Sequence, residues 1–190
     1  MGYPALYVLY RVLDETRPRS ILELGLGQST RMIARYNFWA KECRHAVVDH
    51  NAEWIDFFKK SWPLPEMTAI VNLPLKEETV TLNGQTLAVT VYDGFAEKFQ
   101  GKRFDFICVD GPYGSPNVSR VDIVKILPQC LGESFVIMID DYHRQGEKNT
   151  ANVIGGILRD HGVKFASGGY FGEKGVGIIA SENLQYLCSL

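Results

Sequence analysis

The sequence predicts a single α/β domain, residues 1–190, built on a doubly wound and mostly parallel sheet. Segments typical of strands and of helices alternate along most of the 190 residues. The strand segments are apolar throughout, and several of them end in an acid or a glycine. Strands that are apolar on both sides are typical of a parallel sheet covered by helices on both faces.

The first helix is predicted from apolar residues at helical spacing between Leu6 and Leu13, and it should end near Thr16, ahead of Pro18. Three short apolar segments follow in the first half of the chain, and their length is typical of buried strands. They are residues 20–24, 45–49 and 69–73.

Two helices are predicted between these strands. The first begins at a Ser29 or Thr30 cap and runs to about Trp39. The second begins after Asn51, which is also a good cap, and Pro63 closes it.

A β-hairpin is predicted after the third strand. Residues 79–82 and 85–92 alternate in polarity and flank Asn83-Gly84, a dipeptide that accepts the positive φ angles of a type I′ turn. We expect this hairpin to be an insertion that leaves the main sheet or extends its edge.

The second half of the chain contains four further predicted strands. They are residues 104–109, 135–139, 163–166 and 176–180. The last two are separated by a short turn without a helix, so one of them should run antiparallel to the rest of the sheet.

Two helices are predicted between these later strands. Ser115 caps the first, Pro116 occupies its first turn, and the helix should end near Gly132. The second covers residues 147–161 and stops at Gly162.

Composition limits the classes of function. Lys and Arg total 20 and Asp and Glu total 22, a net charge of -2, which argues against a dedicated nucleic-acid binder. No apolar run approaches the roughly 20 residues that span a bilayer, and the start of the chain does not resemble a secretory signal. The four cysteines are far apart without a CxxC pair. We therefore expect a cytoplasmic protein with reduced, buried thiols and no membrane partner.

Acids and glycines follow four of the predicted strands. These are Glu23-Leu24-Gly25-Leu26-Gly27, Asp49, Asp110-Gly111 and Asp140-Asp141. In a doubly wound sheet, ligands bind beyond the carboxyl ends of the strands, so these residues predict a binding site at that edge. The alternative is that the glycines only make tight turns and the acids only cap helices.

The first of these turns predicts the kind of cofactor. Gly25 and Gly27 let the backbone approach a ligand closely, and Asp49 can accept hydrogen bonds from ribose hydroxyls. A nicotinamide dinucleotide normally requires GxGxxG, but Thr30 occupies the third glycine position. Glu23 would repel a pyrophosphate and attract the cationic amino group of a methionine moiety. The sequence therefore favours S-adenosylmethionine.

Three segments together resemble the class I S-adenosylmethionine-dependent methyltransferases, in particular their O-methyltransferase-like members. Residues 21–30 contain an "ELGxGxST" pattern that is similar to the family's first motif, 47–49 resemble its ribose-binding motif, and 104–112 resemble its fourth-strand motif. The resemblance implies a Rossmann-like sheet of seven strands, in the order 3-2-1-4-5-7-6, with strand 7 antiparallel. One departure is Gln28-Ser29, where many members carry another glycine.

We place the cofactor-binding side of the site on this family pattern and on the strand ends. The assigned residues include Glu23, Asp49, and Gly25 and Gly27 of the turn Gly25-Leu26-Gly27, which we call the glycine turn. The remaining residues that we assign to the cofactor are Ser29, Thr30, His50 and Asp110. His50 is expected on the adenine side, or in local packing.

Asp110, Asp140 and Asp141 resemble the carboxylate set of cation-dependent O-methyltransferases. Oxygen ligands suit Mg²⁺ or another hard divalent cation. Such a cation lowers the pKa of an acceptor hydroxyl and orients it. The alternative is that Asp140 and Asp141 cap the turn and bind loop amides. We expect catalytic roles for Asp110, Asp141 and His143, the last as a base or else as an exposed loop residue.

Acceptor binding is assigned to Tyr113, Arg120 and Arg144, although both arginines could equally form salt bridges to Asp122 or Glu147. The loop that holds Tyr113 is rich in glycine, proline and serine, and is expected to be either a mobile flap or an ordinary connection.

The function expected from these observations is methyl transfer from S-adenosylmethionine to a hydroxyl of a small molecule or carbohydrate, assisted by a divalent cation. Two alternatives stay open, a cofactor-binding module without catalysis and a nicotinamide-dependent oxidoreductase. About 19 residues precede the first strand. The acceptor site is therefore expected to be open or to be completed by a partner subunit, as in a homodimer.

Overall fold

We describe the protein from a computed structural model, in which residues 1–82 and 84–189 are described. The central sheet has seven strands in the order β3-β2-β1-β6-β7-β9-β8. β9 runs antiparallel to both of its neighbours, and the other pairs of neighbours are parallel. This arrangement confirms the predicted order and the predicted antiparallel strand. The strands are β1 (Ser20–Leu24), β2 (Arg44–Asp49), β3 (Thr68–Asn72), β6 (Phe104–Val109), β7 (Leu131–Asp140), β8 (Phe165–Phe171) and β9 (Gly175–Ser181).

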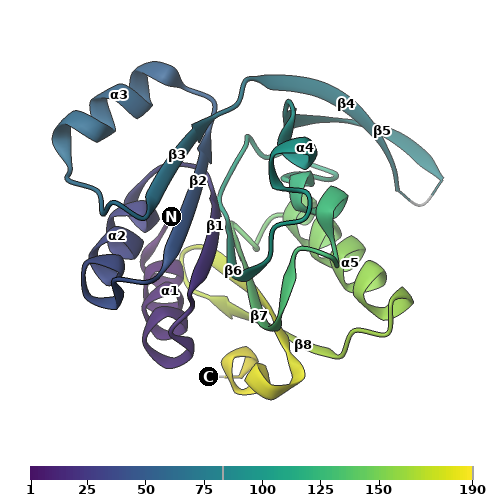
Figure 1. The fold of residues 1–190 in the computed structure, drawn as a ribbon. Coiled ribbons are helices and arrows are strands. Elements are labelled where there is room, and N and C mark those ends of the chain that lie inside the picture. Colours follow the sequence, from purple (N-terminus) through teal and green to yellow (C-terminus); the bar gives the residue numbers. More distant parts are fainter. Residues whose placement is uncertain (83, 190) are drawn as a thin grey trace.

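Helices cover both faces of the sheet, as Figure 1 shows. Consecutive residues of β1 show the two layers, because Ile21 packs with α1 and α2 whereas Leu22 packs with α4 and α5. This alternation follows from the opposite directions of neighbouring side chains in a strand. The helices are α1 (Tyr3–Thr16), α2 (Gln28–Ala40), α3 (Ala52–Ser61), α4 (Phe95–Phe99), α5 (Gln145–Asp160) and the 3₁₀ segments η1 (Asp122–Ile126) and η2 (Glu182–Cys188).

The predicted hairpin is confirmed as a separate two-stranded antiparallel sheet of β4 (Leu75–Leu82) and β5 (Gln85–Tyr92). Gly84 has a φ of 76°, which fits the expected turn, while Asn83 lies outside the described residues. The hairpin projects from the body of the molecule (Figure 1). Its apolar side packs on Val118 and Val121.

The prediction of a helix after Ser115-Pro116 is wrong. The chain there forms an irregular loop, followed only by η1. Val118 and Val121 face the hairpin, and Arg120 between them has a left-handed φ of 57° that no α-helix contains. Sequence patterns also missed α4, which has only five residues.

The four cysteines are free and mostly buried, as expected for packing residues. Within residues 1–82 and 84–189, no helix combines the length and the apolar character that a membrane crossing requires.

Candidate functional site

The glycine turn joins β1 to α2 at the carboxyl edge of the sheet. Gly25 has a φ of 96°, and a Cβ on this residue would lie 2.9 Å from the carbonyl oxygen of Asp110. Only glycine allows this close approach between the ends of β1 and β6. At Gly27 a Cβ would meet nothing within 4 Å, so this part of the turn faces open space.

Ser29 and Thr30 lie in the first turn of α2 and are buried. The helix begins after Gly27, so the predicted cap at Ser29 or Thr30 is wrong by two to three residues. The backbone N–H of Gly27 donates to Thr30 Oγ1 at 2.9 Å, so this hydroxyl supports the cap from inside the first turn. The two side chains therefore shape the turn, and the backbone of Gly27 is the part of it that faces open space.

Asp49 ties the end of β2 to the glycine turn. Its Oδ2 accepts a hydrogen bond from the N–H of Leu26 at 2.9 Å, and its Oδ1 accepts one from the N–H of Asn51 at 2.9 Å. Each carboxylate oxygen has a second lone pair. The geometry thus leaves Asp49 able to accept two further hydrogen bonds, as a ribose diol would require.

Glu23 lies in β1, two residues before Gly25. Its side chain is fully buried, and Oε2 lies 2.9 Å from Nε2 of His45, one strand away. Its Oε1 has no hydrogen-bond partner among the described residues. The role of Glu23 toward the cationic group of a cofactor, directly or through water, therefore stays a prediction, with Oε1 as the acceptor that has no partner among the described residues.

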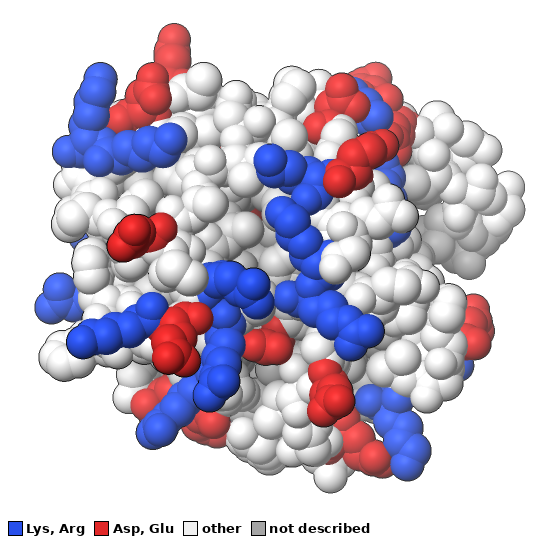
Figure 2. Space-filling model, viewed as in Figure 1, with Lys and Arg blue, Asp and Glu red and all other residues white. Residues whose placement is uncertain are grey.

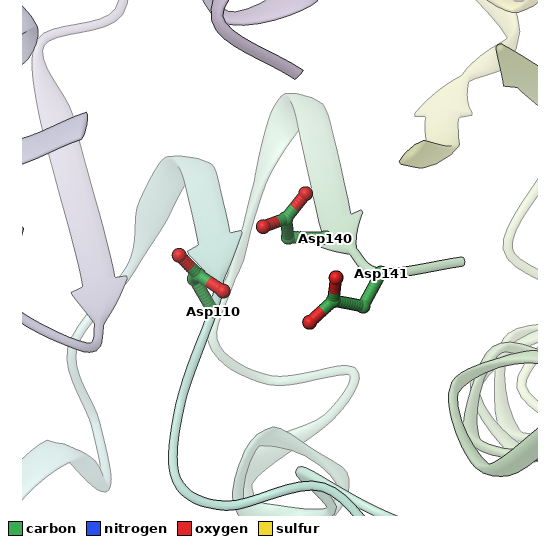
Figure 3. Close-up of side chains that lie close together, drawn as sticks. All are labelled: Asp110, Asp140 and Asp141. Atoms are coloured by element: carbon green, nitrogen blue, oxygen red, sulfur yellow. The ribbon is translucent and has the colours of Figure 1, made fainter. Parts of the chain in front are cut away.

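Three carboxylates converge where β6 and β7 end, as Figure 3 shows. Asp110, Asp140 and Asp141, which we call the acid cluster, each offer an oxygen within 4.8 Å of the others. Asp110 is the most exposed of the three, at 21% of its side chain. Asp141 has a φ of 57°, and this turns its side chain back toward the cluster.

Arg120 is the main internal partner of the acid cluster. Its Nη2 lies 3.1 Å from Asp141 Oδ2 and 3.5 Å from Asp110 Oδ1. Its Nη1 donates to the backbone oxygen of Asp140 at 3.0 Å and its Nε to that of Pro112 at 3.3 Å. Arg120 is only 5% exposed. The structure therefore corrects its predicted role in acceptor binding, because its donors are engaged in holding the carboxylates.

The cluster's remaining oxygens could hold a cation. Both Asp140 carboxylate oxygens and Oδ1 of Asp141 are buried without a hydrogen-bond partner in the described chain. The Met1 nitrogen lies 3.5 Å from Asp110 Oδ2 and 3.4 Å from Asp140 Oδ2, so a positively charged group fits beside them. Lys174 Nζ lies 3.3 Å from Asp141 Oδ1, so the two Asp140 oxygens are the donors most available to a cation. Carboxylate oxygens are the ligands that Mg²⁺ or a similar hard cation prefers. The residues present therefore fit a divalent cation.

Burial and charge act differently on two of these acids. Burial raises the pKa of Asp110 above its ordinary value, the Asp140 carboxylate raises it further, and Arg120 opposes both. Burial alone would also raise the pKa of Asp141, but Arg120, Arg144 and Lys174 outweigh it, so the pKa of Asp141 is lowered. Asp110 is thus the better proton acceptor and Asp141 the better permanent anion.

Tyr113 and His50 meet across the carboxyl edge. His50 Nε2 lies 3.1 Å from the Tyr113 hydroxyl, and the two rings pack edge to face at 5.1 Å. Tyr113 is 65% exposed. The contact connects the end of β2 with the loop after β6 and so spans the glycine turn between them.

Arg144 and His143 lie on the loop between β7 and α5. Arg144 is 47% exposed and binds Asp141 at 3.0 Å, so it can also reach a ligand. His143 is exposed, and its Nδ1 accepts a hydrogen bond from the N–H of Gly175 at 3.2 Å. Its other ring nitrogen then carries the proton in the neutral state, and this arrangement does not favour a role as a base.

The loop after β6 is fastened to α5. Thr150 Oγ1 donates to the backbone oxygen of Ser119 at 2.5 Å, and Asn149 Nδ2 donates to that of Asn117 at 2.6 Å. A Cβ on Gly146 would collide with the Ser115 carbonyl oxygen. These contacts favour the ordinary connection over the mobile flap, and Tyr113 is left as its exposed tip.

Sequence reasoning missed Tyr92. A Cβ on Gly111 would lie 2.6 Å from its hydroxyl, which places this group beside the end of β6. The available signal was Tyr92-Asp93-Gly94, an acid and a glycine at the end of a strand, as in Asp110-Gly111.

Comparison of the sequence with protein-family models and with curated proteins found no match. Solved structures match over almost the whole chain. The O-methyltransferase TomG from Streptomyces achromogenes, in complex with SAM, is 14% identical with a TM-score of 0.65, over 95% of this chain and 81% of that one. The O-methyltransferase from Bacillus cereus, in complex with SAH, is 15% identical with a TM-score of 0.61, over 96% and 82%. SAH-bound methyltransferase PaMTH1 from Podospora anserina is 15% identical with a TM-score of 0.54, over 94% and 77%.

These likenesses show that the chain has the fold of class I O-methyltransferases. The resemblance predicted from the three sequence motifs is confirmed at the level of the fold.

Proposed function

We propose that this chain is an S-adenosylmethionine-dependent methyltransferase that acts on a hydroxyl oxygen of a small molecule or a carbohydrate. One observation carries the proposal: the glycine turn, Asp49 and the acid cluster form one continuous edge. Gly25 touches the backbone of Asp110, and Leu26 is held by Asp49. A cofactor on the turn would therefore lie directly beside the carboxylates.

The turn and Asp49 would bind the cofactor. Backbone beside Gly27 is open to a ligand, and Asp49 has lone pairs for the ribose hydroxyls. The buried carboxylate of Glu23 would favour a positive methionine tail over a diphosphate through its field, because charges interact more strongly where water is excluded.

The acid cluster would serve the acceptor. In the transfer, the acceptor oxygen attacks the methyl carbon in line, the carbon–sulfur bond breaks, and S-adenosylhomocysteine leaves with the electron pair on sulfur. Without a bound cation, the hydroxyl proton would pass to Asp110, whose pKa is raised by burial and by the Asp140 carboxylate. Asp110, Asp140 and Asp141 would hold a divalent cation, which would supply a Lewis acid that lowers the pKa of that hydroxyl.

The acceptor itself would contact the two exposed groups at the rim. Tyr113 offers an aromatic face with a hydroxyl, and Arg144 offers a cation. Both are suited to a sugar or a hydroxylated ring. Arg120 stays behind the carboxylates as a positioning residue.

Calorimetry with S-adenosylhomocysteine tests the cofactor part. We expect micromolar binding by the wild type and binding weaker by about tenfold or more in Asp49→Asn, since a carboxylate forms stronger hydrogen bonds than an amide. Asp56→Asn on the exposed side of α3 is the matched control and should bind like the wild type. Absence of wild-type binding at high micromolar concentration would contradict the proposal.

Mn²⁺ titration followed by electron paramagnetic resonance tests the cation part. We expect the wild type to bind Mn²⁺ and Asp140→Asn to lose most of that binding, because neither Asp140 carboxylate oxygen has a hydrogen-bond partner among the described residues. Methyl transfer from labelled S-adenosylmethionine to hydroxylated small molecules and sugars, with and without chelator, then identifies the acceptor. Turnover that survives chelation would remove the cation from the proposal.

A further inference from the structure

A second hollow lies at the opposite edge of the sheet, where β1, β2 and β3 begin. It has a volume of about 590 Å³, in the range of small-molecule sites. Its inner surface is largely apolar, and three cations stand around it. The lining residues are Ser20, Ile21, Arg44, His45, Ala46, Met67, Ala69, Gly101, Lys102, Arg103 and Phe104. We call it the basic groove.

The groove exists because the connection between β3 and β6 lacks a long helix. This connection consists of the projecting hairpin and the five-residue α4, whose Phe99 packs against Phe104 at the start of β6. Ala69 on β3 is consequently exposed and Ala46 on β2 is only half-buried. In a doubly wound sheet both faces are normally covered, so an uncovered apolar strip inside a hollow is a surface that a ligand can cover.

The three cations of the groove are free to bind an anion. Within residues 1–82 and 84–189, the lysines and arginines that pair with carboxylates are Arg11, Lys76, Arg120, Lys125, Arg144, Lys164 and Lys174. Arg44, Lys102 and Arg103 are exposed and belong to none of these described pairs. Lys102 lies over the ring of Phe99 at 5.1 Å, and this contact holds its side chain at the groove. In Figure 2, Lys and Arg side chains gather across the middle of the view, with Asp and Glu side chains beside and around them.

We propose that the basic groove binds a small amphiphilic anion, with its acidic head on Arg44, Lys102 and Arg103 and its aromatic or hydrocarbon body on the strip around Ala46 and Ala69. Charge decides the class of ligand: a neutral apolar molecule would leave three cations unpaired, and a hydrophilic anion would leave the strip exposed to water. β1 is five residues long, so the groove and the glycine turn are about 16 Å apart. The proposal is therefore independent of the methyltransferase activity.

The dye 8-anilinonaphthalene-1-sulfonate is the probe, because it joins an aromatic body to a sulfonate. Its fluorescence should rise on titration with the folded wild-type protein. Arg44→Gln/Arg103→Gln should bind it about tenfold more weakly or worse, since two charge-assisted contacts are removed. Lys59→Gln/Lys60→Gln on exposed positions of α3 changes the net charge equally and should bind like the wild type.

A substitution that leaves the charge unchanged tests the contribution of the apolar strip to binding separately from that of the cations. Ala69→Trp fills the groove from an exposed position and should abolish binding, while circular dichroism confirms the fold. Saturating S-adenosylhomocysteine should leave dye binding unchanged. The proposal is overturned if the wild type does not bind the dye, if the arginine double variant binds it normally, or if S-adenosylhomocysteine displaces it.

Discussion

Gly25 and Gly27 of the glycine turn have different physical roles. At Gly25, φ is 96° and a Cβ would press on the backbone of Asp110, whereas Gly27 has an extended φ of −173° and open space around it. Gly25 is therefore a requirement of the fold, and Gly27 leaves room for a ligand.

Gly25→Ala should lower the free energy of unfolding by about 2–4 kcal/mol, because backbone strain and a backbone clash add. Gly27→Ser should change it by less than about 0.5 kcal/mol, since serine is a good helix cap, yet should weaken S-adenosylhomocysteine binding. Urea unfolding and calorimetry on the same samples measure both quantities. Equal stability losses in the two variants would contradict this division.

Arg120 and Arg144 bind the same carboxylate from different environments. Arg120 is 5% exposed and Arg144 is 47% exposed, and both lie near Oδ2 of Asp141. Arg120→Met leaves buried carboxylates without their partner and should cost about 3–5 kcal/mol of unfolding free energy. Arg144→Met should cost less than about 1 kcal/mol. Urea unfolding of both variants checks the contrast, and a mild effect at Arg120 would mean that the cluster relaxes without it.

At the scale of elements, the strands that position the site were predictable, whereas α4 and the loop after β6 were not. β1, β2, β6 and β7 are apolar runs that end in acids or glycines, a local pattern that needs no tertiary information. The segment after Ser115 contains helix-like apolar spacing, but the hairpin and α5 compete for those side chains and hold the chain in an open loop.

The acid cluster was predictable for the same reason, because parallel strands bring their carboxyl ends to one edge. The pairing of Glu23 with His45 was not, since it depends on which residues of β1 and β2 share a face of the sheet. The role of Arg120 depends on its left-handed backbone and on contacts across the fold, neither of which the sequence displays.

Asp122 links η1 to the hairpin, and its contribution to the free energy of unfolding depends on pH. Its Oδ1 accepts a hydrogen bond from the N–H of Tyr92 at 2.7 Å, and burial raises the pKa of Asp122 to about 7. The unfolded chain loses this proton near pH 3.9, so between these values the folded state binds more protons than the unfolded state. The contribution of Asp122 to stability therefore falls as pH rises through that window.

Asp122→Asn should remove this dependence. The variant should be close to the wild type near pH 4.5 and more stable above about pH 7, by up to about 4 kcal/mol. Urea unfolding across the pH range, compared with Asp56→Asn on the exposed side of α3, isolates the effect. A variant that is less stable than the wild type at pH 7.5 would show that the carboxylate is ionised and needed at this position.

At the scale of the whole molecule, the sheet separates two edges with different chemistry. The carboxyl edge holds the glycine turn and the acid cluster, and the amino edge of β1 to β3 holds the basic groove. The groove could not be predicted from the sequence, because it forms where the crossover between β3 and β6 has no long helix to cover the sheet. Composition also hides it, since the net charge of the chain is only -2.

Ligand-induced stabilisation of the whole domain distinguishes the two classes of cofactor that this fold accommodates. A ligand that binds only the folded state stabilises it by about 2.7 kcal/mol at 100 times its Kd, which for a domain of this size raises Tm by roughly 5–10 °C. S-adenosylhomocysteine should produce this shift and NAD should not, because the diphosphate of NAD would lie above the buried carboxylate of Glu23. Glu23→Gln removes that charge without changing the shape of the side chain. It should therefore reduce the Tm increase caused by S-adenosylhomocysteine and allow a Tm increase with NAD. A larger shift with NAD than with S-adenosylhomocysteine in the wild type would leave the fold unchanged but reassign the activity to hydride transfer.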